Sequence, residues 1–203
     1  MTDRVHEAAA QYSTGGKPLR VEEFFRAVAN GLLGPRDRVE LLEGQIVAMS
    51  PQSPRHAAVT SILRERLAAA APTACLRAHS PIVLGALSAP EPDVVVAQGP
   101  CERYLERHPQ AQDIWLVVEV SDSSLATDRT LKARLYAEHG IPEYWLVDLT
   151  KGAVEVFRTP SAGVYGSCER IRKRSLQAAL QTASDQWRVP EKRVGVVYNA
   201  ILA

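Results

Sequence analysis

The stretch Ile114-Trp115-Leu116-Val117-Val118-Glu119-Val120 is apolar at every position except Glu119. A run with apolar residues on both of its alternating faces is typical of a central β-strand that is covered on both sides. A charged side chain at such a position is costly unless a partner compensates it. The run therefore predicts a buried strand, and it marks Glu119 as a residue with a specific partner.

The segments on either side of this strand alternate between helical and extended patterns. The sequence predicts an α/β (α+β) fold in which a mixed β-sheet is flanked by helices, with an N-terminal helix and a β-hairpin. Thr127 is the expected cap of the helix after the central strand, and Gly140 follows its end. The expected helices are 21–33, 56–71 and 127–139; the hairpin is 39–49, turning at Glu43-Gly44; the other strands are 78–84, 93–97, 143–148, 153–158 and 164–174.

The length of 203 residues predicts one domain, over residues 19–203, after a loosely held segment 1–18. Residues 187–203 are expected to pack as a closing segment. The 24 basic and 23 acidic side chains nearly cancel, so bulk charge does not indicate a nucleic-acid partner. Arg170, Arg172 and Arg174 would share one face of an extended strand, which suits either a phosphate backbone or a solvated sheet edge.

The three cysteines, Cys75, Cys101 and Cys168, are odd in number and lack the spacing of a CxxC pair or a zinc site. They favour a reducing, cytoplasmic location with unpaired thiols. Apolar stretches fall short of the ~20 residues that a membrane helix needs. The first residues lack the apolar core of a signal peptide. We therefore expect no membrane association.

A second acidic residue, Asp93, follows Pro92 and opens the apolar run 94–96. Two carboxylates that converge from neighbouring strands can bind Mg²⁺, which prefers oxygen ligands and takes one or two carboxylates from the protein. Asp93 and Glu119 are therefore candidate metal ligands. The alternatives are that Asp93 is a turn residue and that Glu119 pairs with an arginine such as Arg134 or Arg77.

A lysine follows on the next predicted helix. Asp128, Lys132 and Tyr136 are spaced at i, i+4 and i+8, and therefore share one helix face. This face can direct Lys132 toward Glu119, where an ammonium group would stabilise negative charge. The alternative is a solvated ion pair between Lys132 and Asp128, and Tyr136 is expected to be a packing residue.

Pro92-Asp93 followed by Glu119-Val120-Ser121 resembles the PD-(D/E)XK nuclease pattern. A longer ordered set resembles, more narrowly, the bacterial Uma-type putative restriction endonuclease family. The set covers most of 21–158 and comprises Glu40-Leu41-Leu42-Glu43-Gly44, Met49-Ser50-Pro51, His56, Pro92-Asp93, Val118-Glu119-Val120-Ser121, Asp128-Arg129, Lys132, Tyr136 and Gly140-Ile141-Pro142-Glu143-Tyr144-Trp145-Leu146-Val147-Asp148.

The resemblance implies a restriction-endonuclease-like fold with a four-stranded core sheet, and DNA cleavage that depends on Mg²⁺, with Mn²⁺ as a substitute. It implies that Asp93 and Glu119 hold the metal and that Lys132 replaces the superfamily lysine, whose usual place is taken by Ser121. Ser121 is also a candidate substrate contact. Asp122 departs from the proline that is typical after this serine.

Two further residues carry open alternatives. The resemblance suggests that Glu43 or Glu40 faces the site, whereas Glu43 could equally be a plain hairpin residue. His56 either begins a helix or acts near the metal.

The resulting hypothesis is a DNA endonuclease, for which a homodimer would bring together two sites for two strands. The alternatives are a non-catalytic module that binds nucleic acid or protein, and a phosphatase that uses the same carboxylates.

Overall fold

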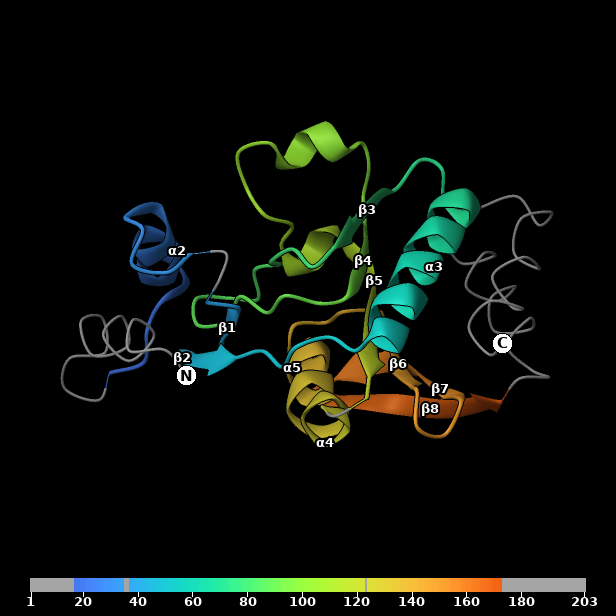
Figure 1. The fold of residues 1–203 in the computed structure, drawn as a ribbon. Helices are drawn as coiled ribbons and strands as arrows, with labels where there is room; N and C mark the ends of the chain where they lie inside the picture. The colour runs from blue at the N-terminus through green and yellow to red at the C-terminus, as the bar shows by residue number, and fades with distance from the viewer. Residues whose placement is uncertain (1–16, 35–36, 123, 173–203) are drawn as a thin grey trace.

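The computed structural model describes residues 17–34, 37–122 and 124–172. Its main body is a six-stranded mixed sheet with the order β3-β4-β5-β6-β7-β8 (Figure 1). β5 and β6 are parallel, and the other neighbouring strands are antiparallel. The sheet confirms the mixed α+β class but has more strands than the expected four. The strands are Cys75–Ala78 (β3), Val94–Ala97 (β4), Ile114–Ser121 (β5), Glu143–Asp148 (β6), Ala153–Ser161 (β7) and Val164–Arg172 (β8).

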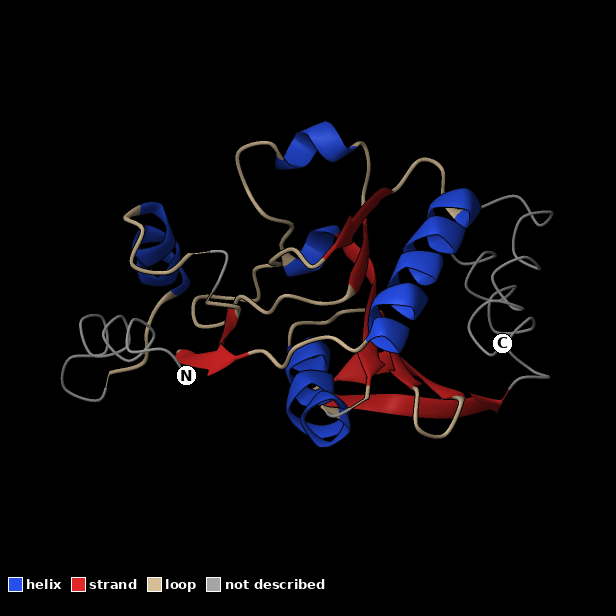
Figure 2. Cartoon of the chain, viewed as in Figure 1, coloured by secondary structure: helices blue, strands red, loops and turns tan. Residues whose placement is uncertain are grey.

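Helices cover both faces of the central strands (Figure 2). On one face of the sheet, Leu116, Val118 and Val120 of β5 pack in a buried cluster with apolar residues of α3 (Pro54–Ala70). Val117 packs on the opposite face with Leu135 of α5 (Ala133–Glu138). Because side chains alternate along a strand, Glu119 is directed to the α5 face.

The helical segment after β5 consists of α4 (Leu125–Thr127), a π-helical turn η3 (Asp128–Lys132) and α5. It begins before Thr127, so the prediction that Thr127 caps it is wrong. Ser124 occupies the cap position, but its hydroxyl donates a hydrogen bond to the Asp128 carboxylate instead of capping the backbone. Gly140 follows the helix with a φ of 71°, as expected for a glycine that ends a helix.

A two-stranded hairpin lies beside the main sheet with helix α2 (Val21–Ala29) packed against it. Its strands are Val39–Leu42 (β1) and Gln45–Ala48 (β2), which confirms the predicted turn at Glu43-Gly44. Gly44 has a φ of 77°, and a Cβ there would meet the Pro18 Cβ at 2.4 Å. Glycine is therefore required at this turn.

The prediction of a strand over 78–84 is wrong, because the strand in this region ends at Ala78. β3 covers Cys75–Ala78, and residues after it run as a loop with isolated bridges at Val83 and Leu84. His79 has a φ of 45°, and Pro81 has no backbone N–H to donate. Both features end the β-ladder before it reaches the predicted range.

Cys75 of β3 and Cys101 form a disulfide, so the expectation of three unpaired thiols is wrong. Cys101 begins the 3₁₀ helix η1 (Cys101–Tyr104), and a second, η2 (Ala111–Asp113), precedes β5. The sequence separation of 26 residues concealed the pairing. The cysteines consequently give no support to a reducing compartment.

The predicted closing segment 187–203 and the N-terminal segment 1–16 lie outside the described residues. Among the helices that are described, none is long and apolar enough to cross a bilayer.

Candidate active site

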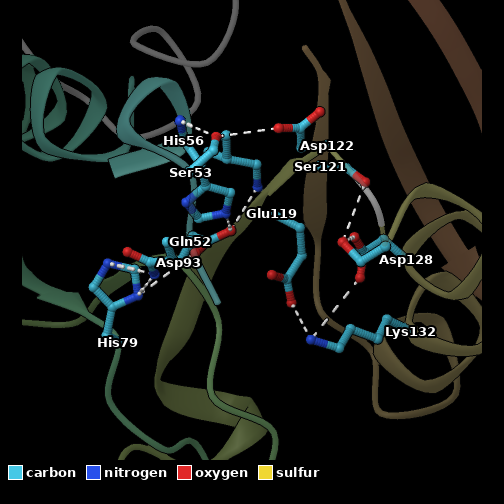
Figure 3. A network of polar contacts seen from close by, with 12 residues as sticks. Gln52, Ser53, His56, His79, Asp93, Glu119, Ser121, Asp122, Asp128 and Lys132 are labelled. Carbon is cyan, nitrogen blue, oxygen red and sulfur yellow. Dashed lines mark hydrogen bonds and ion pairs between the residues drawn. The ribbon is translucent and has the colours of Figure 1, made fainter. Parts of the chain in front are cut away.

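A cavity of about 300 Å³ opens where β4 begins and β5 ends. It collects ionisable side chains from five segments that are distant in the sequence. Figure 3 labels His56, Asp93, Glu119, Asp128 and Lys132 among them. The hairpin, the start of α3, both strands and the η3 turn all contribute. Its ionisable lining residues are Arg38, Glu40, His56, Glu91, Asp93, Glu119, Asp122, Asp128 and Lys132.

Asp93 is fixed at the start of β4 beside the end of β5. The pairing of Val94 with Val118 brings the preceding residue, Asp93, next to Glu119. The Asp93 Oδ2 atom accepts a hydrogen bond of 2.7 Å from the Val120 backbone N–H. Asp93 is 7% exposed, so it is a buried and oriented carboxylate rather than a free turn residue.

Glu119 is held by one of its two carboxylate oxygens. Lys132 Nζ lies 3.1 Å from Glu119 Oε1, and the Tyr136 hydroxyl donates to the same oxygen at 2.7 Å. Within the described residues both hydrogen bonds to Glu119 end on Oε1, which leaves Oε2 available to a ligand. The suggested arginine partners are wrong: Arg134 binds Glu43 and Glu138, and Arg77 contacts His108.

Lys132 is buried among carboxylates and is not a solvated surface lysine, because it is 6% exposed. Its Nζ atom lies 3.1 Å from Glu40 Oε1, and 3.9 Å from Asp128 Oδ1. The residue ends a π-helical turn, a wider turn that is frequent at functional sites. Thus the predicted approach of Lys132 to Glu119 is present in the structure.

The site carries more negative than positive charge. Burial raises the pKa of Glu119 to about 8, with Lys132 opposing this shift and the other acids adding to it. Burial alone would lower the pKa of Lys132, but Glu119, Glu40 and Asp128 outweigh it and raise that pKa. Lys132 thus contacts three carboxyl groups, and a divalent cation bound at Glu119 would favour the deprotonated form of that residue.

Two histidines flank Asp93 (Figure 3). His56 Nε2 lies 3.2 Å from Asp93 Oδ2, and His79 Nδ1 lies 3.5 Å from Asp93 Oδ1. The hydrogen bond to Asp93 raises the pKa of His56, whereas burial lowers the pKa of His79. Both alternatives for His56 therefore hold. It lies in the first turn of α3, where the Ser53 hydroxyl accepts a hydrogen bond from its backbone N–H, and its side chain faces the site.

Sequence reasoning missed the position of His79. No residue near His79 in the sequence has the spacing of a metal-binding motif. Only the conformation of the loop after β3 brings its side chain to Asp93. Tyr136, expected to be a packing residue, also donates a hydrogen bond from its hydroxyl to Glu119. The shared helix face of Tyr136 with Lys132 was the available signal for it.

The structure selects Glu40 over Glu43. Glu40 is buried, contacts Lys132, and accepts a hydrogen bond from the Glu91 backbone N–H at 3.1 Å. Glu43 is at the hairpin turn with a φ of 50°, where its exposed side chain pairs with Arg134 at 2.9 Å. The interpretation of Glu43 as a site residue is therefore corrected, because the turn directs it away from the cavity.

Two of the predicted substrate contacts, Ser121 and Arg170, do not line the cavity. Ser121 is fully buried, and its hydroxyl lies 3.3 Å from that of Ser124, which in turn binds Asp128. Arg170 pairs with Glu155 on β7, at the border of a separate cavity. Of Arg172 the structure describes the backbone alone, and Arg174 lies outside the described residues.

The donor set fits a hard divalent cation. Asp93 and Glu119 offer carboxylate oxygens from adjacent strands, and Mg²⁺ commonly takes two protein carboxylates with water and phosphate oxygens. In the described part of the chain, no three His, Cys, Asp or Glu side chains form a metal centre by themselves. The ion would therefore require water and substrate oxygens, as an open catalytic site does.

Comparison with solved structures defines the class of fold. The crystal structure of a putative nuclease belonging to DUF820 from Anabaena variabilis ATCC 29413 is similar, with a TM-score of 0.63 over 91% of this chain and 100% of that chain. The sequence identity is 16%, so this likeness shows a shared nuclease-like fold.

The family described as "Putative restriction endonuclease" (Uma2) matches residues 21–189, and the chain belongs to this family. This confirms the resemblance that the ordered motifs indicated. No curated protein matches the chain.

Proposed function

We propose that the protein is a metal-dependent endonuclease that hydrolyses phosphodiester bonds of DNA. The observation that carries the proposal is the convergence of buried Asp93, Glu119 and Lys132 at one cavity. Membership of the Uma2 family supports the reaction class. The excess of carboxylates over cations supports the metal, for which Mg²⁺ is the expected ion and Mn²⁺ a substitute.

Asp93 and Glu119 would hold the metal. When bound, such an ion lowers the pKa of water and neutralises charge on the phosphate. The Val120 N–H and the two histidines orient Asp93, and Tyr136 orients Glu119. Because these partners are already in place, the carboxylates need little rearrangement to bind the ion.

Lys132 would stabilise the negative charge that develops on the phosphate. Its ammonium group borders the cavity and stays protonated, because three carboxylates surround it. A buried cation has a stronger effect on such charge than an exposed one, because little water screens it. The assignment makes Lys132 an electrostatic residue rather than a general base.

The test is nicking of supercoiled plasmid in EDTA, Mg²⁺ or Mn²⁺ by the native protein, Glu119→Gln and Glu43→Gln. Glu43→Gln is a matched control, since it makes the same chemical change at an exposed glutamate that faces away from the cavity. We expect metal-dependent nicking that Glu119→Gln abolishes and Glu43→Gln retains.

Equal nicking by the native protein and Glu119→Gln would overturn the proposed site. Metal-independent DNA binding without nicking would favour the non-catalytic module. Turnover of small phosphate esters in place of DNA would favour the phosphatase. Linear product formed without a nicked intermediate would indicate that two sites act together, as in a homodimer.

A further inference from the structure

A second cavity, of about 600 Å³, lies beside the catalytic cavity. Its walls come mainly from α2, from the hairpin and from the loop that follows β3. The two cavities share the lining residues Arg38, Met49, Gln52 and Glu91. Because they have a common rim, one ligand can occupy both.

The second cavity offers flat, apolar surfaces. Phe25 of α2 stacks on His108 with ring centroids 4.8 Å apart and an interplanar angle of 24°. Leu33 contributes a buried apolar surface, and Val28 is 44% exposed at the same cavity. Burial and the nearby Arg77 lower the pKa of His108, which favours the uncharged ring. Such surfaces suit a planar aromatic group.

His79 and Gln52 connect this cavity to the proposed metal ligands. His79 lines the apolar cavity and lies 3.5 Å from Asp93 Oδ1. The Gln52 amide Nε2 lies 3.1 Å from His79 Nδ1, on the side of Asp93 away from Glu119 and Lys132 (Figure 3). A phosphate at Asp93 would thus have the aromatic cavity on one side and Lys132 on the other.

We propose that the second cavity receives one unstacked nucleobase of the strand that is cut, from a nucleotide next to the scissile phosphate. The inference rests on the proposed nuclease function and extends it to the substrate. Every base has an apolar face that can stack on Phe25 and His108, and stacking tolerates any sequence. The Gln52 amide and the Glu91 carboxyl border the cavity, where polar base edges would lie.

This assignment has a consequence for the substrate. A base in a duplex must leave its stack before it can enter a protein cavity, which costs a few kcal/mol and costs least where the strand is already unpaired. We therefore expect a preference for single-stranded or locally unpaired DNA over a regular duplex.

The experiment measures binding in Ca²⁺ of the shortest single-stranded DNA oligonucleotide that keeps full affinity, because that length fixes one binding register; gel analysis verifies that the strand stays intact. One abasic site is placed in turn at each position. The proteins are the native chain, Phe25→Leu, Phe25→Tyr and Leu105→Ala. Phe25→Leu keeps apolar bulk without a ring, Phe25→Tyr keeps the ring, and Leu105 is an 81% exposed control that does not line the cavity. Thermal unfolding verifies that each variant is folded.

We expect one abasic position to weaken binding to the native protein about ten-fold, the size of one stacking contact. Phe25→Leu should bind the intact strand about ten-fold more weakly and lose its sensitivity to that position. Phe25→Tyr and Leu105→Ala should behave as the native protein does. If the abasic site and Phe25→Leu weaken binding less together than the sum of their separate effects, the base at that position contacts the Phe25 ring. A general loss of stability would not produce this dependence on one position.

Equal sensitivity of the native protein and Phe25→Leu at every position would overturn the inference, as would a folded Phe25→Leu with native affinity. Mg²⁺-dependent cleavage of the same intact oligonucleotide, compared between the native protein and Glu119→Gln, separates the two proposals. Cleavage without a base-dependent Phe25 effect refutes the base site alone. Absence of cleavage of both this oligonucleotide and the supercoiled plasmid refutes the nuclease.

Discussion

The Tyr136 hydroxyl donates a hydrogen bond of 2.7 Å to Glu119 Oε1, from α5 to the central strand β5. Both residues are buried, and the contact holds the carboxylate in one rotamer while Oε2 stays available. A tyrosine that fills the core thus also orients a proposed metal ligand.

Tyr136→Phe should lower the cleavage rate about ten-fold, equivalent to about 1.4 kcal/mol, because the hydrogen bond to Glu119 is lost and this carboxyl group is less well oriented. The measurement is the rate against Mg²⁺ concentration. Tyr165→Phe is the matched control, because it also removes a tyrosine hydroxyl, which there donates to the Ile141 carbonyl. An equal loss of rate in both variants would contradict the orienting role of Tyr136.

Lys132→Met should abolish cleavage and destabilise the fold by about 3–5 kcal/mol, because it leaves buried carboxylates without their cation. The measurement is urea unfolding in EDTA and in Mg²⁺. We expect Mg²⁺ to restore more stability to Lys132→Met than to the native protein, since a bound cation would compensate the same acids. The exposed Arg134→Met should cost less than about 1 kcal/mol and show no such difference. Identical Mg²⁺ effects on both variants would argue against a metal at this cluster.

Removal of divalent metal should lower the melting temperature of the native protein, because a ligand that binds only the folded state stabilises it by mass action. At a Mg²⁺ concentration of about 100 times its dissociation constant the stabilisation is about 2.7 kcal/mol. Asp93→Asn should lose this response, and Asp122→Asn, which changes an exposed acid that binds Ser53 at the rim, should keep it. A response that survives Asp93→Asn would place the ion elsewhere.

Stability should fall at acidic pH through Asp113. The hydrogen bond from Arg107 lowers the pKa of Asp113 below its ordinary value of 3.8. The Asp113 carboxyl group therefore binds a proton less readily in the native state than in the unfolded chain. Its contribution to the free energy of unfolding is complete above pH 3.8 and is lost as the pH falls below that value. Urea unfolding of the native protein and Asp113→Asn from about pH 2 to about pH 7, a range that begins well below this transition, measures the effect. The two curves should converge at the acidic end; parallel curves would contradict the assignment.

The disulfide predicts the thiol count. Titration of the unreduced, denatured protein should find the single thiol of Cys168, and reduction should expose those of Cys75 and Cys101 as well. Reduction should also destabilise the fold by about 2–4 kcal/mol, because the unfolded chain is no longer cross-linked. Three thiols before reduction would show that the bond does not form in the purified protein.

Local patterns were sufficient to predict the class of fold, the hairpin turn and the candidates Asp93, Glu119 and Lys132. Glu119 is conspicuous in the sequence because its neighbours on both faces of the predicted strand are apolar, which indicates that the strand is buried. The helical spacing of Lys132 from Asp128 likewise gives its direction without knowledge of the partner.

Tertiary structure decided which side chains complete the site. Glu40 and Glu43 are close in the sequence, and only the placement of the hairpin against α5 brings the first to Lys132 and leaves the second at the surface. His79 reaches Asp93 through a loop residue with positive φ, and Cys75 meets Cys101 through the pairing of β3 with β4 and the turn beyond it. Periodicity reports the face of one element; these contacts depend on how several elements pack together, and no single stretch of sequence carries that information.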